Sequence, residues 1–138
     1  MSFDPRGLPV ALVRAVSDAG YAQPTDVQSR AIPAALQGVD LRVSSSTGSG
    51  KTAAFVLPAL ARVLAARNDP AKRRDKGIVH GPRVLVLAPT RELALQVANA
   101  TTVYGRHVPG LRVATVVGGV PYGAQLKALR GPLDVLIA

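Results

Sequence analysis

The residues of this chain best suited to chemistry stand together in the segment Ser46-Thr47-Gly48-Ser49-Gly50-Lys51-Thr52. Gly48 and Gly50 allow a tight turn whose consecutive backbone N–H groups can approach an anion closely. A helix that begins directly after the turn would add its positive dipole end. Lys51 could then reach the β- and γ-phosphates of a nucleoside triphosphate, and the Thr52 hydroxyl could bind Mg²⁺. The segment therefore predicts a phosphate-binding loop.

The alternative for this segment is an ordinary glycine-rich turn without a ligand. That alternative leaves unexplained why Gly, Lys and Thr are adjacent where a strand gives way to a helix. The first position of the wider pattern is Ser45, where Gly or Ala is usual, and we expect the small Ser side chain to leave the loop intact. A phosphate loop by itself indicates only nucleoside triphosphate binding, because kinases, transporters and motors all use one.

The elements that would position this loop alternate along the chain between helical and strand periodicity. Helices are predicted at residues 8–19, 25–37, 51–67, 90–104 and 121–129, and strands at residues 41–44, 84–88, 112–117 and 133–138. This order predicts an α/β fold in which helices flank a parallel β-sheet.

Several positions refine that prediction. Pro33 predicts a kink in the second helix or a later start, and Pro58 should bend or divide the third helix. The continuous apolar run at residues 84–88 predicts a strand that is buried on both faces. The polar and basic stretch at residues 68–82 predicts a solvated surface loop, with a nucleic-acid contact as the less favoured alternative. Asp134, at the beginning of the last predicted strand, is interpreted as a strand-edge or turn residue.

Composition narrows the class of protein. The chain has 138 residues, enough for one domain, and a formal net charge of +9, which suits a polyanion partner. An Arg-rich genome is the alternative explanation of the charge. The absence of Cys excludes disulfides, thiol catalysis and Cys-based zinc sites, and the isolated His80 and His107 have no metal-ligand spacing. No apolar run is long enough to span a membrane and no signal peptide is recognisable, so we expect a cytoplasmic protein.

Motifs on both sides of the phosphate loop carry a resemblance to a known family. Upstream stand Phe3 and the segment Gly20-Tyr21-Ala22-Gln23-Pro24-Thr25-Asp26-Val27-Gln28. Downstream stand Ala88-Pro89-Thr90-Arg91-Glu92-Leu93-Ala94 and the pair Gly118-Gly119. In this order and spacing the chain resembles the DEAD-box RNA helicases over essentially its whole length. The resemblance implies that residues 1–138 are the N-terminal part of the first RecA-like domain of such an enzyme.

The resemblance also implies roles for single residues in binding ATP. Tyr21 matches the aromatic residue that stacks on adenine, and Phe3 matches the isolated upstream aromatic that supports this motif. Gln28 matches the glutamine that recognises the adenine edge, a task suited to an amide because it offers a donor and an acceptor side by side. Two alternatives remain open from the residues alone. Gln28 could complete a capping box with Thr25, and Tyr21 could simply pack over the helix start.

The downstream motifs imply contacts with RNA, single-stranded or duplex. Pro89, Thr90, Arg91 and Glu92 match a segment that lies along one RNA strand, and the backbone of Gly118 and Gly119 is implied to approach the same strand. Here too the residues allow other interpretations. Thr90 is a plausible helix N-cap, Arg91 and Glu92 could form a local ion pair, and the glycine pair could be only a turn.

The acidic Asp-Glu-Ala-Asp motif, the Ser-Ala-Thr motif and the second RecA-like domain of the family are absent from this sequence. Without the acids that bind Mg²⁺ and position water, we expect a truncated chain that binds nucleotide weakly and has negligible ATPase activity. The full-length protein is expected to be an ATP-dependent RNA helicase. The alternatives are a DNA-directed superfamily 2 helicase or translocase and a non-enzymatic basic module that binds nucleic acid through charge.

Overall fold

Three parallel strands form the sheet of the computed structural model, which describes residues 7–46, 48, 50–69, 71 and 81–138. The strands are β1 (Val84–Val86), β2 (Val113–Thr115) and β3 (Val135–Ile137), and their order in the sheet is β1-β3-β2. Leu136 in the middle of β3 is in register with Leu85 of β1 and with Ala114 of β2. The predicted α/β fold with a parallel sheet is therefore confirmed.

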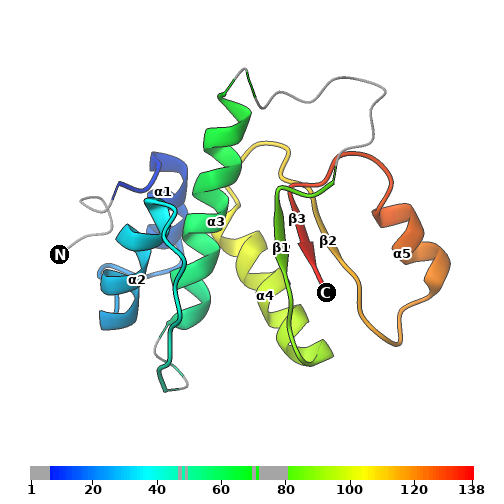
Figure 1. Cartoon of the computed structure of the whole chain (residues 1–138), viewed down its shortest axis with the longest axis horizontal. Coiled ribbons are helices and arrows are strands. Elements are labelled where there is room, and N and C mark those ends of the chain that lie inside the picture. Colours follow the sequence, from blue (N-terminus) through cyan, green and yellow to red (C-terminus); the bar gives the residue numbers. More distant parts are fainter. Residues whose placement is uncertain (1–6, 47, 49, 70, 72–80) are drawn as a thin grey trace.

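Five helices in the described part of the chain accompany this sheet, as Figure 1 shows. They are α1 (Val10–Asp18), α2 (Asp26–Leu36), α3 (Lys51–Arg67), α4 (Arg91–Tyr104) and α5 (Tyr122–Ala128). Helices α3 and α4 lie between the α1–α2 pair and the sheet, whereas α5 lies at the opposite edge, beside β2. The fold thus places α3, at whose start the phosphate loop was predicted, against α2 on one side and α4 on the other.

The core extends from α1 and α2 through α3 and α4 to the middle strand of the sheet. Its largest fully buried side chains include Leu12 of α1, Ile32 of α2, Leu57 and Leu60 of α3, and Ile137 of β3. Aliphatic side chains dominate this cluster, as the low aromatic content requires. Burial of such side chains removes apolar surface from water and supplies the main stabilisation of the fold.

One predicted strand is absent, and the burial predicted for another is wrong. The segment at residues 41–44 is not a strand, and Leu41 and Val43 are exposed. A strand needs a neighbour to pair its backbone groups, and within the described part of the chain this segment pairs with none. Residues 84–88 are not buried on both faces either, since Leu85 is 58% exposed and Leu87 is 75% exposed. Among the described strands, β1 lies at an edge and only β3 has neighbours on both sides.

Each predicted helix is present, and α2 and α3 both continue through their prolines. α2 begins at the predicted cap and contains Pro33, and α3 is one continuous helix through Pro58, so division of that helix at Pro58 is wrong. Pro58 itself is buried, so tertiary packing outweighs the loss of one backbone hydrogen bond. Phe3, Thr47, Ser49, His80 and most of the predicted loop at 68–82 lie outside the described residues.

Asp134 has a larger role than the predicted strand-edge residue. Its side chain is buried, and its Oδ2 accepts hydrogen bonds from the Arg67 guanidinium at 2.7 Å and from the Arg112 backbone N–H at 2.9 Å. Arg67 stands at the end of α3 and also donates to the carbonyls of Pro109 and Gly110. The carboxylate therefore joins the end of α3 to the start of β3 and to the segment that precedes β2.

We predict that Asp134→Ala lowers the free energy of unfolding by about 2–3 kcal/mol, because the partly buried Arg67 guanidinium loses its charged partner and the Arg112 N–H loses its acceptor. Asp40→Ala is the matched control, since Asp40 is exposed, and should change stability by less than about 0.5 kcal/mol. Denaturant unfolding of the two variants measures the difference. Equal losses would contradict a structural role for Asp134.

Candidate functional site

The predicted phosphate loop leads directly into a helix. Gly50 is the N-cap residue of α3 and has a left-handed backbone with φ of 85°, which glycine adopts without strain. Gly48 has φ of 82°. Lys51 is the first residue of α3, a helix of 17 residues, so backbone N–H groups and the positive helix end meet at this turn. The described part of the loop therefore has two left-handed glycines directly before the start of a long helix.

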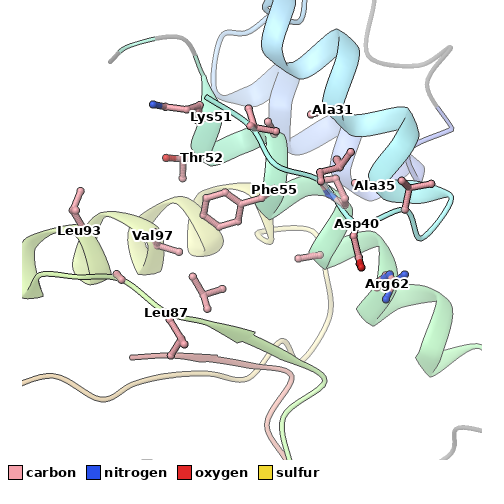
Figure 2. Close-up of a pocket in the computed structure, with 18 of the residues that line it drawn as sticks. Ala31, Ala35, Asp40, Lys51, Thr52, Phe55, Arg62, Leu87, Leu93 and Val97 are labelled. Carbon is pink, nitrogen blue, oxygen red and sulfur yellow. The ribbon is translucent and has the colours of Figure 1, made fainter. Parts of the chain in front are cut away.

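The two side chains predicted for phosphate and magnesium chemistry follow directly on the loop. The Lys51 ammonium is exposed and donates a hydrogen bond to the Ser45 carbonyl, which closes the loop on itself. Thr52 is half-buried. Figure 2 shows both side chains at one end of a large cleft.

Gln28 connects α2 to this loop. Its Oε1 accepts from the Thr25 N–H at 3.0 Å, and the Thr25 hydroxyl accepts from the Gln28 N–H at 3.3 Å, so the capping box is formed. The Nε2 group donates to the Gly50 carbonyl at 3.1 Å. A Cβ atom at Gly50 would lie 2.4 Å from this Nε2 atom. The absence of a side chain at Gly50 thus allows the amide of Gln28, which is 5% exposed, to reach the phosphate loop.

Tyr21, which follows α1, has a different neighbour from Gln28. Its side chain is 53% exposed. Burial raises the pKa of Tyr104 at the end of α4, and the adjacent Tyr21 hydroxyl raises that pKa further. Tyr21 therefore packs near α4, whereas Gln28 meets the loop, and Phe3 lies outside the described residues.

A second surface unites the two motifs that were predicted separately to contact RNA. Pro89, Thr90, Arg91 and Glu92 are all exposed at the start of α4, where the Thr90 hydroxyl caps the helix by accepting from the Leu93 N–H at 3.2 Å. The Arg91 guanidinium extends to the glycine pair, since its Nη1 lies 2.7 Å from the position of a Cβ atom on Gly119. We name the surface formed by Pro89–Glu92 and Gly118–Gly119 the motif surface. In the described part of the chain, no ion pair joins Arg91 to Glu92.

A cleft of about 710 Å³ links the phosphate loop to the motif surface. Its walls come from α2, the segment 38–43, α3, the end of β1 and α4 (Figure 2). Lys51 and Thr52 line it at the loop, and Pro89 lines it at the motif surface. No sequence pattern predicted this cleft. The available signal was the pair of apolar runs at 41–44 and 84–88, which were interpreted as strands.

Comparison with known proteins shows the family of this chain. The model of the DEAD/DEAH box helicase family matches residues 25–138. The chain is 41% identical to the ATP-dependent RNA helicase DeaD of Haemophilus influenzae over 99% of its length, and 43% identical to DeaD of Escherichia coli over 98%. The chain belongs to the DEAD/DEAH box helicase family. It spans about a fifth of the length of the curated relatives it matches.

Solved structures show the same fold. The RNA helicase Prp28 from Chaetomium thermophilum bound to ADP superimposes with a TM-score of 0.83 at 38% identity, over 99% of this chain and 31% of that one. A hypothetical ATP-dependent RNA helicase from Sulfolobus tokodaii superimposes with a TM-score of 0.72 at 35% identity, over 93% of this chain and 33% of the other. Within the described residues, no helix has the length and apolar character needed to cross a membrane.

We predict that Gln28→Glu keeps the cap of α2 but removes the hydrogen bond to the phosphate loop. A glutamate keeps the acceptor for the Thr25 N–H but cannot donate to the Gly50 carbonyl. The affinity of the full-length protein for ATP should fall about tenfold, measured by titration with a fluorescent ATP analogue. Thr25→Ala is the matched comparison, because it removes the cap and should cost about 1 kcal/mol of stability with a smaller effect on ATP affinity. Equal ATP affinities for Gln28→Glu and the unchanged protein would contradict this role.

The glycine pair offers a second test, because its two residues differ in conformation. Gly119 has φ of 81° and lies against Arg91, whereas Gly118 has open space where a Cβ would stand. We predict that Gly119→Ala lowers the free energy of unfolding by about 1–2 kcal/mol and displaces Arg91. Gly118→Ala should change stability by less than about 0.5 kcal/mol. Thermal unfolding of both variants measures these losses. A larger loss of stability in Gly118→Ala than in Gly119→Ala would contradict a left-handed Gly119 packed against Arg91.

Proposed function

We propose that the full-length protein is a cytoplasmic ATP-dependent RNA helicase, in which RNA-stimulated ATP hydrolysis drives local unwinding of RNA duplexes. This chain supplies the ATP-binding part of that enzyme and part of its RNA path. One observation carries the proposal: the Gln28 amide donates to the Gly50 carbonyl, so the motif predicted to recognise adenine is joined to the phosphate loop. The relatives named above are RNA helicases, which supports RNA as the nucleic acid.

In this proposal the phosphate groups of ATP bind at the start of α3. The phosphates bind to the backbone of the loop, which comprises Ser46, Thr47, Gly48, Ser49 and Gly50. Lys51 neutralises the β- and γ-phosphates. Tyr21, Phe3 and Gln28 are assigned to the adenine; Tyr21 would reach it from its position beside Tyr104 at the end of α4. Gln28 already uses its amide within the protein, so adenine recognition and loop support share one side chain.

Magnesium is the implied metal, and the residues present fit it in part. The Thr52 hydroxyl is an oxygen donor at the loop, and Mg²⁺ commonly combines one or two protein oxygens with phosphate oxygens and water. Within the described residues, no cluster of three or more His, Cys, Asp or Glu side chains could hold a metal. Thr52 would therefore hold Mg²⁺ together with the nucleotide, and Mg²⁺ would supply positive charge against the charge developing on the phosphates.

RNA contacts are assigned to the motif surface. The side chains of Thr90, Arg91 and Glu92 and the backbone of Pro89, Gly118 and Gly119 form an exposed surface that can follow one strand. Arg91 provides a cation and the glycines provide accessible backbone, two kinds of group that contact a phosphate backbone often. The net charge of +9 adds a general attraction to a polyanion.

We predict that Lys51→Ala in the full-length protein lowers ATP affinity by at least about tenfold and abolishes RNA-stimulated ATP hydrolysis, because the phosphates lose their cation. Lys127→Ala removes the same charge from an exposed position on α5 and should leave ATP binding unchanged. Phosphate release with single-stranded RNA, single-stranded DNA or no nucleic acid measures the activity. Equal stimulation by DNA would favour the DNA-directed alternative, and salt-sensitive binding without any ATP effect would favour the basic module.

A further inference from the structure

The glycine pair of the motif surface is held by a side chain that no motif singled out. Gln125 lies on α5, and its Nε2 donates to the Val117 carbonyl at 3.1 Å and to the Val120 carbonyl at 3.0 Å. These two carbonyls belong to the residues immediately before and after Gly118–Gly119. Both N–H groups of one amide are therefore used to close the turn from Val117 to Val120 around the glycine pair.

The helix that carries Gln125 has little other anchorage. None of the seven residues of α5 is buried, and Gln125 is the only one that is not exposed. Tyr122 at the start of this helix is 77% exposed. A helix this short gains its stability from tertiary contacts rather than from its own hydrogen bonds. The two hydrogen bonds of Gln125 thus join the partly buried side of α5 to the turn that precedes it.

The hydrogen bond to the Val117 carbonyl also determines the direction in which the Gly118 N–H points. The Val117 carbonyl and the Gly118 N–H belong to one planar trans peptide unit, in which the two groups point in opposite directions. Because the carbonyl points toward Gln125, the Gly118 N–H points away from it. A backbone N–H held in one direction is the kind of donor that binds a phosphate oxygen of a nucleic-acid backbone.

A second side chain reaches the turn from the motif at the start of α4. Arg91 fills the space that a side chain on Gly119 would need. Gln125 of α5 thus holds the turn by hydrogen bonds, and Arg91 of α4 lies against Gly119. This arrangement explains why a glycine pair without large side chains can keep one conformation.

We propose that Gln125 is a positioning residue for RNA binding, which acts by holding the Gly118–Gly119 turn with its backbone directed toward an RNA phosphate. This inference rests on the proposed function, because it assumes that the motif surface binds RNA. Gln125 does not itself contact RNA in this proposal. Its loss should weaken RNA binding without affecting the phosphate loop, which lies at the start of a different helix.

The test compares Gln125→Glu and Gln125→Ala in the full-length protein with the control Lys127→Gln on the same helix. Glutamate has nearly the size of glutamine, but its carboxylate cannot donate and would face two carbonyl oxygens. Hydrogen exchange of the segment 117–121 should become faster in both Gln125 variants. The dissociation constant for a ten-nucleotide oligouridylate, with a non-hydrolysable ATP analogue present, should rise roughly fivefold to tenfold. ATP affinity should not change in these variants, and the control should match the unmodified protein in every measurement.

Each result decides a different claim. Unchanged exchange at 117–121 in Gln125→Glu would overturn the inference, because the turn would not depend on the amide. Faster exchange with unchanged RNA affinity would also overturn it, because Gln125 would then be only structural. If the proposed function itself is wrong, the unmodified protein will bind the ATP analogue but not the oligouridylate. This result does not depend on the Gln125 variants.

Discussion

A single hydrogen bond, from the Gln28 amide to the Gly50 carbonyl, joins the two halves of the candidate nucleotide site. It is possible only because Gly50 has no side chain and adopts a left-handed backbone. The same amide completes the cap of α2 through Thr25. The start of α2 and the start of α3 are therefore coupled through one buried side chain. Any ligand that moves the loop must also disturb this contact, which links the proposed adenine motif physically to the phosphate loop.

The cleft beside the loop shows that an apolar segment forms a buried strand only when neighbouring strands pair with it. Residues 41–44 and 84–88 were both predicted as strands, yet Leu41, Val43, Leu85 and Leu87 are exposed. A strand is buried only when neighbours cover its faces and pair its edges. In the described part of the chain, β3 has neighbours on both sides, whereas β1 has one and the segment 41–44 has none. Residues 84–86 do form β1, and both apolar segments contribute to the walls of the cleft of about 710 Å³.

The motif surface depends on contacts between elements that are distant in sequence. Arg91 and Gly119 are far apart along the chain but adjacent in space, and Gln125 holds the same turn from α5. The buried Asp134 plays a comparable part before β3, which it joins to the end of α3. Polar side chains, in addition to apolar packing, thus set the positions of the loops that surround the sheet.

The sequence by itself determined the local features of this protein. The glycine turn before α3, the Thr25–Gln28 capping box, the Thr90 cap and the limits of α3 and α4 follow from neighbouring residues, because turns, caps and helical periodicity depend on side chains within a few positions. The family motifs were recognisable for the same reason. Only the tertiary structure decided which apolar runs became strands, that Gln28 reaches Gly50, and that Arg91 and Gln125 meet at one turn. These outcomes depend on residues brought together from distant parts of the chain, and no local pattern records them.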